Sequence, residues 1–271
     1  MLKQERQDRI LSEVQRRGSL PVAELAAALD VSEITIRRDL EELDGRGYLK
    51  RVRGGAQPLG PHEPEPPVLQ RQLSELKEKQ AIAAAAVELV REGDVIALES
   101  GSTTMELARA IAKRTWKSVQ VVTNSFPIAQ ELMRVPGVVA VFAGGTVNRE
   151  ELAAFGVLTE EILKHISIHK LFIGCRGIHP ETGLSNDVQA AAEIATVRAL
   201  AAASQKVYVL ADHTKFERTF LVQMLPISAV DGVVTDGLTP EPILQELRKQ
   251  VRRVVVAPVE ASDQIREKET G

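Results

Sequence analysis

Residues 95–111 read VIALESGSTTMELARAI, an apolar run followed by small polar residues and then by a helical pattern. The stretch predicts a strand, a turn at Gly101–Thr104 and a helix. Backbone N–H groups and the positive end of the helix dipole make such a helix start a site for anions, phosphate above all. The stretch therefore predicts one strand–helix unit of an α/β domain that could hold a phosphate group.

The same alternation of apolar strands and helices continues along the chain. Further Val/Ile/Leu-rich strands are expected at residues 119–123, 138–144, 170–175, 206–212, 232–236 and 252–257. Strands of this composition separated by helices indicate a mostly parallel, Rossmann-like sheet that helices cover on both faces. We expect this α/β domain to span residues 69–258, with residues 259–271 as a loose tail.

Residues 57–68, QPLGPHEPEPPV, hold five of the thirteen prolines and predict an extended linker. Before it, three helical patterns occur, with Pro21 starting the second and Ser32 capping the third. The segment YLKRVRGGAQ predicts a two-stranded ribbon that turns at Gly54–Gly55. Three helices followed by a basic ribbon predict a small winged helix-turn-helix domain at residues 1–56.

The third helix and the ribbon carry candidate DNA contacts. If the apolar residues of the helix face inward, Ile34 and Arg38 lie on the opposite face. An arginine there can bind guanine or clamp a phosphate. Ile34 either touches a thymine methyl group or packs beneath the ribbon. Arg46 adds to a basic cluster around the ribbon, and the candidate DNA-binding residues are Ser32, Glu33, Ile34, Thr35, Arg37, Arg38, Lys50, Arg51 and Arg53.

Composition limits the other classes of function. The chain is 44% hydrophobic with a net charge of −3, and it has no long uncharged apolar run and no signal-like N-terminus. Cys175 is the only cysteine, so we expect a cytoplasmic protein without disulfides. His165 and His169 are four residues apart, but no glutamate motif joins them, so we expect surface histidines. The glycine motifs of nucleotide-binding loops are absent from the sequence. We expect no metal ion, no cofactor and no membrane contact.

Four polar clusters follow predicted strands, at the sheet edge where ligands of such domains bind. Glycines there let a ligand approach the backbone, hydroxyls donate to its oxygens, and a lysine supplies positive charge. Helix capping by Ser102 or Ser125 is the alternative reading of a single cluster. The candidate effector-binding residues are Glu99, Gly101, Ser102, Thr103, Thr104, Thr123, Asn124, Ser125, Gly144, Gly145, Asp212 and Lys215.

These motifs resemble those of the DeoR family of bacterial transcriptional regulators. VSEITIRRDLEEL with RGGA is similar to the family's helix-turn-helix, and ESGSTT, VVTNS, FAGG, GGTVN and ADHTKF are similar to its sensor domain. The resemblance implies a regulator that responds to phosphorylated sugars or metabolites derived from them. One departure is Glu99, because the family usually has aspartate there.

The family's sensor domain is related to ribose-5-phosphate isomerase, which raises the alternative of an enzyme with an attached DNA-binding module. The isomerase has acid–base aspartates after a central strand, and the matching segment here is IGCRGIH. Ile173 and Arg176 stand at the aspartate positions, and neither side chain can move protons as a carboxylate does. Glu99, Asp187 and Asp212 remain as conceivable bases, but we expect no catalytic residues and a site that senses its ligand.

The sequence therefore predicts a repressor of a carbohydrate-use operon that binds double-stranded operator DNA and is controlled by a phosphorylated sugar. A DNA-binding domain this small gives limited specificity, so we expect a homodimer or homotetramer that reads repeated half-sites. A purely oligomerising scaffold would not explain four polar clusters on one sheet edge.

Overall fold

The structure, a computed structural model, describes residues 2–45, 48–58, 65–187 and 190–259. By their internal contacts the residues form two units, which we call the N-terminal unit (1–76 with 147–153) and the sheet unit (77–146 with 154–271). Residues 59–64 of the predicted linker and 260–271 of the predicted tail lie outside the described residues. The predicted domain boundaries stay predictions.

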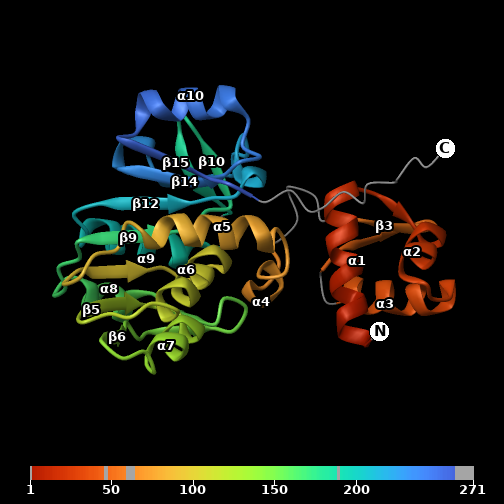
Figure 1. The fold of residues 1–271 in the computed structure, drawn as a ribbon, viewed down its shortest axis with the longest axis horizontal. Coiled ribbons are helices and arrows are strands. Elements are labelled where there is room, and N and C mark those ends of the chain that lie inside the picture. The colour runs from red at the N-terminus through yellow and green to blue at the C-terminus, as the bar shows by residue number, and fades with distance from the viewer. Residues whose placement is uncertain (1, 46–47, 59–64, 188–189, 260–271) are drawn as a thin grey trace, which may run out of the picture. The chain divides into compact units, whose positions relative to one another are not determined.

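The N-terminal unit contains the predicted helix-turn-helix (Figure 1). Its first helices are α1 (Lys3–Arg17), α2 (Val22–Leu29) and α3 (Glu33–Gly45), and its strands are β1 (Leu20–Pro21), β2 (Lys50–Val52) and β3 (Gly55–Gln57). Apolar side chains of all three helices form one core, with Ile10, Leu25, Ile36 and Leu40 almost fully buried. The apolar periodicity therefore predicts the correct inner faces.

The ribbon differs from the prediction in two respects. Strand β1 pairs with β3, so the described strands form a three-stranded sheet in the order β1-β3-β2. The turn residues are Arg53 and Gly54, because Val52 pairs with Gly55 and Gly54 adopts a φ of 88°. A Cβ on Gly55 would lie 2.1 Å from the carbonyl oxygen of Leu20. Gly55 is therefore required for close strand pairing, and the turn requires only Gly54.

The N-terminal unit also includes α4 (Val68–Arg71) and residues of β7 (Thr146–Asn148) and β8 (Ala153–Phe155), which form a two-stranded sheet. The backbone N–H of Val68 donates to the carbonyl of Glu150 at 2.9 Å. Arg71 forms ion pairs with Glu151 at 2.6 Å and with Glu65 at 3.0 Å. Burial raises the pKa of Glu151 even though Arg71 opposes that shift. These contacts tie residues 147–153 to α4.

The sheet unit confirms the predicted parallel α/β architecture. Its seven described parallel strands have the order β15-β14-β12-β9-β4-β5-β6. Their bounds are β4 (Val95–Leu98), β5 (Val119–Thr123), β6 (Val138–Phe142), β9 (Lys170–Ile173), β12 (Val207–Leu210), β14 (Gly232–Asp236) and β15 (Arg253–Ala257). All seven lie at positions where the apolar runs predict strands.

Helices cover both faces of this sheet (Figure 1). One core contains side chains of α5 (Leu76–Val87), α6 (Ser102–Ala112) and α7 (Phe126–Leu132). The core on the other face contains side chains of α8 (Val157–Leu163), α9 (Ala191–Ala202) and α10 (Glu241–Gln250). Strands buried on both faces explain why the sequence shows continuous apolar runs and no polar alternation.

A second, antiparallel sheet was not predicted. Among the described residues it consists of β10 (Gly177–His179), β11 (Gly183–Asn186) and β13 (Val222–Leu225), with β11 in the middle. The short helical turns η2 (His213–Lys215) and η3 (Ile227–Ala229) flank β13 in the chain. These strands have three or four residues and mixed polarity, so they lack the apolar run that marks the main strands.

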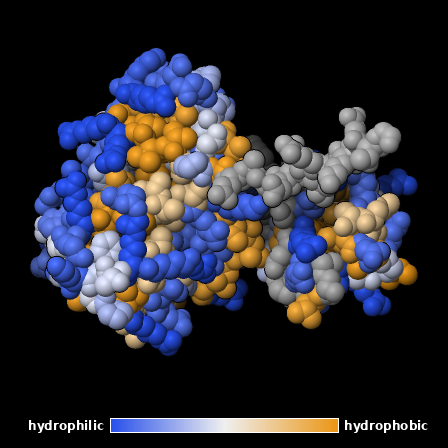
Figure 2. All heavy atoms as spheres, in the orientation of Figure 1, coloured by the Kyte–Doolittle hydropathy of each residue, from blue (hydrophilic) through white to orange (hydrophobic). Residues whose placement is uncertain are grey.

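The surface of the sheet unit is partly apolar. Figure 2 shows apolar side chains gathered below α10 on the visible face, in the region of the edge strand β15. The other edge strand is β6, and Val139 on it is exposed.

Within the described part of the chain, no helix is long and apolar enough to cross a membrane.

Candidate DNA-binding face and effector site

Helix α3 is capped and anchored as the sequence predicts. The side chain of Ser32 accepts a hydrogen bond from the backbone N–H of Thr35 at 3.2 Å, which is the expected N-cap contact. Ile36, Leu40 and Leu43 are buried in the core of the N-terminal unit. The helix is therefore fixed by its apolar face, and its opposite face is left for recognition.

The exposed face of α3 carries the predicted contact residues. The side chain of Ile34 is 67% exposed, so it does not pack beneath the ribbon and is accessible to a thymine methyl group. Glu33, Arg37 and Arg38 are also exposed, and Glu33 pairs with Arg37 at 3.0 Å. An exposed pair of this kind contributes only about 0.3–0.5 kcal/mol, so a DNA phosphate can replace Glu33 as the partner of Arg37.

The ribbon presents the predicted cations of the wing. Lys50, Arg51 and Arg53 are exposed on β2 and the turn that follows it. The backbone N–H of Arg51 donates to Asp44 at 2.9 Å, which ties the wing to the end of α3. Arg46, the other cation of this basic cluster, lies outside the described residues.

We expect Arg38→Ala and Arg51→Ala to weaken DNA binding in different ways. Loss of a bidentate contact between Arg38 and guanine is expected to cost about 1–3 kcal/mol and to relax specificity at one base pair. Loss of a phosphate contact from Arg51 is expected to weaken all sequences alike and to reduce the salt slope by about one. Fluorescence anisotropy with operator and random DNA across a salt titration measures both. Wild-type binding by both variants would show that the assigned face is wrong.

The carboxyl ends of neighbouring parallel strands bring the polar clusters to one edge of the sheet. Glu99–Thr104 follows β4, Thr123 ends β5, and Gly144 and Gly145 follow β6. The cluster beginning at Asp212 follows β12. In the order β12-β9-β4-β5-β6, these strands are contiguous except that β9 lies between β12 and β4. The topology therefore brings the predicted clusters together and adds to them the residues that follow β9.

Helix α6 begins as expected for an anion site. Gly101 is its N-cap residue, and the first turn is closed by the N–H of Met105, which donates to the carbonyl of Gly101 at 3.0 Å. The hydroxyl of Thr104 donates to the same carbonyl at 3.0 Å. Ser102 is therefore the first helical residue and not the cap, so the capping alternative for Ser102 is wrong. The N–H groups of the first turn have no acceptor within the helix and point outward from its start.

The alternative reading of Ser125 as a cap gains no support either. Ser125 occupies the N-cap position of α7, but its side chain makes no capping hydrogen bond within the described structure. Its backbone N–H donates to the hydroxyl of Thr123 at 3.1 Å. The role of both residues toward a ligand stays a prediction.

Asp212 is a buried carboxylate held in its charged form. It is 1% exposed, and Oδ1 accepts from the backbone N–H of Thr214 at 3.0 Å and from the Thr214 hydroxyl. Burial opposes ionisation, but Lys215, Lys79 and the hydrogen bonds from Thr214 together lower the pKa of Asp212. Oδ2 is buried and has no hydrogen-bond partner among the described residues. Such an oxygen is a strong acceptor for a ligand hydroxyl.

The short turn η2 positions Lys215 beside this carboxylate. Asp236 is buried at the end of β14 and accepts the backbone N–H of His213 at 2.7 Å. Its carboxylate also lies 3.2 Å from the imidazole of His213. The N–H of Lys215 donates to the carbonyl of Asp212 at 3.0 Å. The turn that carries Lys215 is therefore anchored at both ends.

Lys79 is a site residue that the sequence analysis missed. It lies on the buried face of α5 with Ile82, Ala83 and Ala86, and it is 2% exposed. A lysine is buried this deeply only with charged partners, and Lys79 acts on the carboxyl of Asp212. The spacing 79, 82, 83, 86 marks it as part of the inner helix face and could have revealed it.

Several predicted effector residues have structural contacts of their own. The buried amide of Asn124 accepts from the N–H of Ser100 and donates to the carbonyl of Ala154, both at 3.1 Å. A Cβ on Gly145 would lie 2.1 Å from the hydroxyl oxygen of Thr159, so packing requires this glycine. Buried Glu99 accepts from the hydroxyl of Ser100 at 2.8 Å. Binding of a ligand by Glu99, Asn124 and Gly145 stays a prediction.

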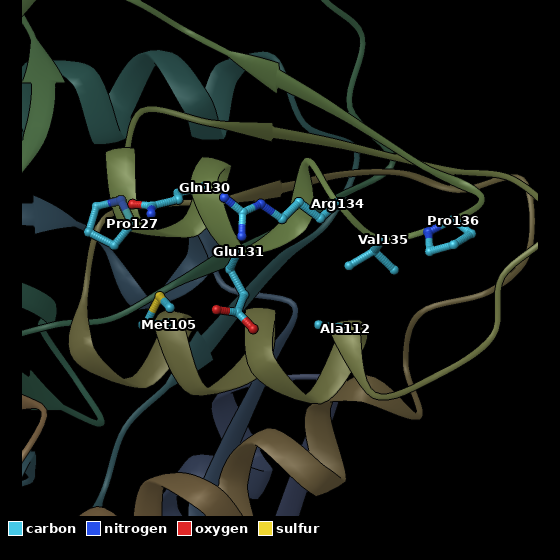
Figure 3. Close-up of a pocket in the computed structure, with 8 residues that line it drawn as sticks. All are labelled: Met105, Ala112, Pro127, Gln130, Glu131, Arg134, Val135 and Pro136. Atoms are coloured by element: carbon cyan, nitrogen blue, oxygen red, sulfur yellow. The ribbon is translucent and has the colours of Figure 1, made fainter.

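A separate surface hollow of about 540 Å³ lies between α6 and α7 (Figure 3). Figure 3 shows Met105 and Ala112 on α6 facing Glu131 on α7 and Arg134 just after it. None of the predicted effector residues lines this hollow. The effector site predicted at the carboxyl edge of the sheet is therefore separate from this hollow, and it stays a prediction.

His169 lies away from that edge. Its Nδ1 accepts the backbone N–H of Val95 at 3.1 Å and lies 3.6 Å from Asp94, at the start of β4. His165 is an exposed residue that follows α8, with Glu161 3.8 Å away. Within the described residues there is no group of three or more potential metal ligands.

A winged helix-turn-helix, joined in one chain to an α/β sheet with a buried polar edge, defines a DNA-binding regulator with a sensor domain. The chain belongs to the DeoR family of transcriptional regulators. Residues 6–59 match the DeoR-like helix-turn-helix domain, and residues 74–237 match the DeoR C terminal sensor domain.

Two relatives show this similarity over nearly the whole chain. The chain is 31% identical to the putative aga operon transcriptional repressor of Escherichia coli O157:H7, over 93% of each chain. It is 35% identical to the HTH-type transcriptional regulator GlpR of Haloferax volcanii, over 88% of this chain and 91% of that one. The protein is therefore a transcriptional regulator and not an enzyme.

Solved structures of enzymes are more distant. Ribose 5 phosphate isomerase A from Neisseria gonorrhoeae is 21% identical, with a TM-score of 0.38 over 51% of this chain and 52% of that chain. A likeness at this level says nothing about ligand or activity.

Proposed function

We propose that the protein represses a carbohydrate-use operon and that a phosphorylated sugar, or a metabolite derived from one, controls its binding to double-stranded operator DNA. The observation that carries this proposal is Asp212, a buried carboxylate with two lysines acting on it and one oxygen without a partner among the described residues. A lysine pair suits a phosphate, and the carboxylate oxygen suits a sugar hydroxyl.

The phosphate would lie at the start of α6, where backbone N–H groups and hydroxyls of Ser102, Thr103 and Thr104 can donate to its oxygens. Lys215 would add a charge-assisted bond. Asp212 and Glu99 would accept hydroxyls of the sugar and so orient it. Oδ2 of the buried Asp212 has no hydrogen-bond partner among the described residues, so a ligand that cannot donate to it would leave that oxygen unsatisfied and would bind more weakly.

Control of DNA binding requires that the effector distinguish two arrangements of the protein. A ligand with equal affinity for the DNA-competent and incompetent arrangements would shift neither. We propose a homodimer or homotetramer in which the sheet units supply the subunit contacts. Exposed apolar side chains on the sheet unit, Val157 and Leu158 on α8 and Val139 on the edge strand β6, support subunit contacts through this unit.

A thermal-shift screen of the full-length protein tests the proposed effector class. We expect one or more sugar phosphates to raise the melting temperature by several degrees at about 100 times their Kd, a stabilisation of about 2.7 kcal/mol. The dephosphorylated sugar is the control and is expected to shift it far less. The active compound is also expected to release operator DNA in an anisotropy assay. A preference for the unphosphorylated sugar would contradict a phosphate site.

A further inference from the structure

Arg176 is a buried cation with no role in the effector site proposed above. Its side chain is 8% exposed and forms an ion pair with Asp187, whose side chain is 31% exposed. The guanidinium also lies over the ring of Phe220, 4.3 Å from the ring centroid. The aromatic ring orients the plane of the guanidinium, and the carboxylate balances its positive charge.

The topology brings Arg176 to the same sheet edge as Lys215. Arg176 follows β9, the strand that lies between β4 with Glu99 and β12 with Asp212. An isolated parallel bridge joins Ile178 to Phe216. Gly177 directly precedes Ile178, and Lys215 directly precedes Phe216. The segment of Arg176 therefore runs alongside the turn that carries the proposed phosphate-binding lysine.

The partner of Arg176 can be exchanged. Asp187 lies just after β11, and its N–H donates to the side chain of Asn186 at 2.8 Å. A partly exposed carboxylate can rehydrate when another anion replaces it, whereas a buried guanidinium needs an anion at all times. An anionic group of a ligand would therefore substitute for Asp187 without leaving Arg176 unpaired.

The charges at this edge also favour a third cation for an acidic ligand. The buried carboxylate of Asp212 balances part of the charge of Lys79 and Lys215. A sugar phosphate already brings its own negative charge to these two lysines. A ligand with a second anionic group needs one more positive partner, and the planar fork of an arginine suits carboxylate and phosphate alike.

We infer that Arg176 is a specificity-determining residue that exchanges Asp187 for a second anionic group of the effector. The preferred effectors are then sugar phosphates with a second acidic group, either a carboxylate or another phosphate. This inference rests on the proposed function, because the first phosphate is assigned to α6 and Lys215. Arg176 would distinguish sugar phosphates with a second acidic group from those without one.

Matched ligand pairs test the inference by calorimetric titration of the full-length protein. The pairs are glucose 6-phosphate with 6-phosphogluconate, fructose 6-phosphate with fructose 1,6-bisphosphate, and ribulose 5-phosphate with ribulose 1,5-bisphosphate. In the wild type we expect the more acidic member of at least one pair to bind at least about tenfold more tightly. Arg176→Gln is expected to abolish that difference and leave the affinity for the monophosphate unchanged. The first pair reports a carboxylate, and the other two report a second phosphate.

Asp187→Asn distinguishes a ligand-binding Arg176 from a purely structural Arg176–Asp187 ion pair. It removes the internal competitor, so we expect tighter binding of the acidic ligand and unchanged binding of the monophosphate. A structural salt bridge would instead make both variants weaken every ligand alike, and that result would overturn the inference. Equal affinities within every pair in the wild type would also overturn it, while the proposed function would stand. Failure of all six compounds to bind would overturn both. If Arg176→Gln does not fold, Arg176→Lys and Asp187→Asn give the same comparison.

Discussion

Lys215→Ala is expected to lower the affinity of the full-length protein for its sugar phosphate by about 10- to 100-fold. The reason is the loss of one hydrogen bond to a charged group, which contributes about 1.5–3 kcal/mol. Lys215 also helps to keep Asp212 ionised, so its removal weakens two parts of the site at once. Calorimetric titration with a compound that raises the melting temperature measures the loss.

Lys79→Met is also expected to lower the affinity, by a factor no larger than Lys215→Ala, because buried Lys79 acts on the same carboxylate less strongly than Lys215 does. Methionine keeps most of the volume of the side chain and removes its charge. Lys206→Ala is the matched control, since Lys206 is an exposed lysine of the same unit. Operator binding without effector is expected to stay near the wild-type value in all three variants. Equal effector affinity in wild type and Lys215→Ala would place Lys215 outside the site.

The main features of this edge could be predicted from the sequence because strong local signals mark them. Continuous apolar runs such as residues 95–98 mark buried parallel strands, and polar residues directly after them mark the ligand-binding edge. Ser32 marks the start of α3 because a hydroxyl at that position satisfies a helix N–H. These signals are local in the chain and do not depend on the order of the strands.

The features of this edge that the sequence does not reveal depend on contacts between residues distant in the chain. The position of β9 between β12 and β4 follows from strand order, which apolar runs do not encode. Gly145 is predicted as a ligand contact, but its lack of a side chain also meets a packing requirement set by Thr159. The sequence does not single out Lys79, because a lysine near a charged helix start suggests a solvent-exposed position. Its helical spacing was the better signal, since three apolar residues share its face.

Arg6→Ala is expected to destabilise the N-terminal unit by about 3 kcal/mol, because it leaves a buried carboxylate without its cation. Asp39 on α3 is 3% exposed at its side chain, and Arg6 on α1 binds it with Nε 2.5 Å from Oδ2. The hydrogen bond to Asp39 raises the pKa of the Arg6 guanidinium. Gln7 adds a weaker contact at 3.3 Å to the other carboxylate oxygen, which cannot replace the lost charge.

Arg9→Ala is the matched control for this prediction. Arg9 also lies on α1 and pairs with a carboxylate, Glu5, but both side chains are more than half exposed. Exposed pairs of this kind contribute about 0.3–0.5 kcal/mol, so the control is expected to change little. Hydrogen exchange of the amides in α1 and α3 of the full-length protein measures the loss of stability where it arises.

The consequence for DNA binding follows from the position of Asp39 next to Arg38. Asp39 holds the inner side of α3 against α1, while Arg38 faces outward on the same turn. At low temperature, where the unit stays folded, Arg6→Ala is expected to leave operator affinity close to wild type. At higher temperature, affinity is expected to fall together with amide protection, since only folded protein binds. Loss of operator binding at full amide protection would instead mean that Arg6 contacts DNA, and would contradict the structural role of the Arg6–Asp39 pair.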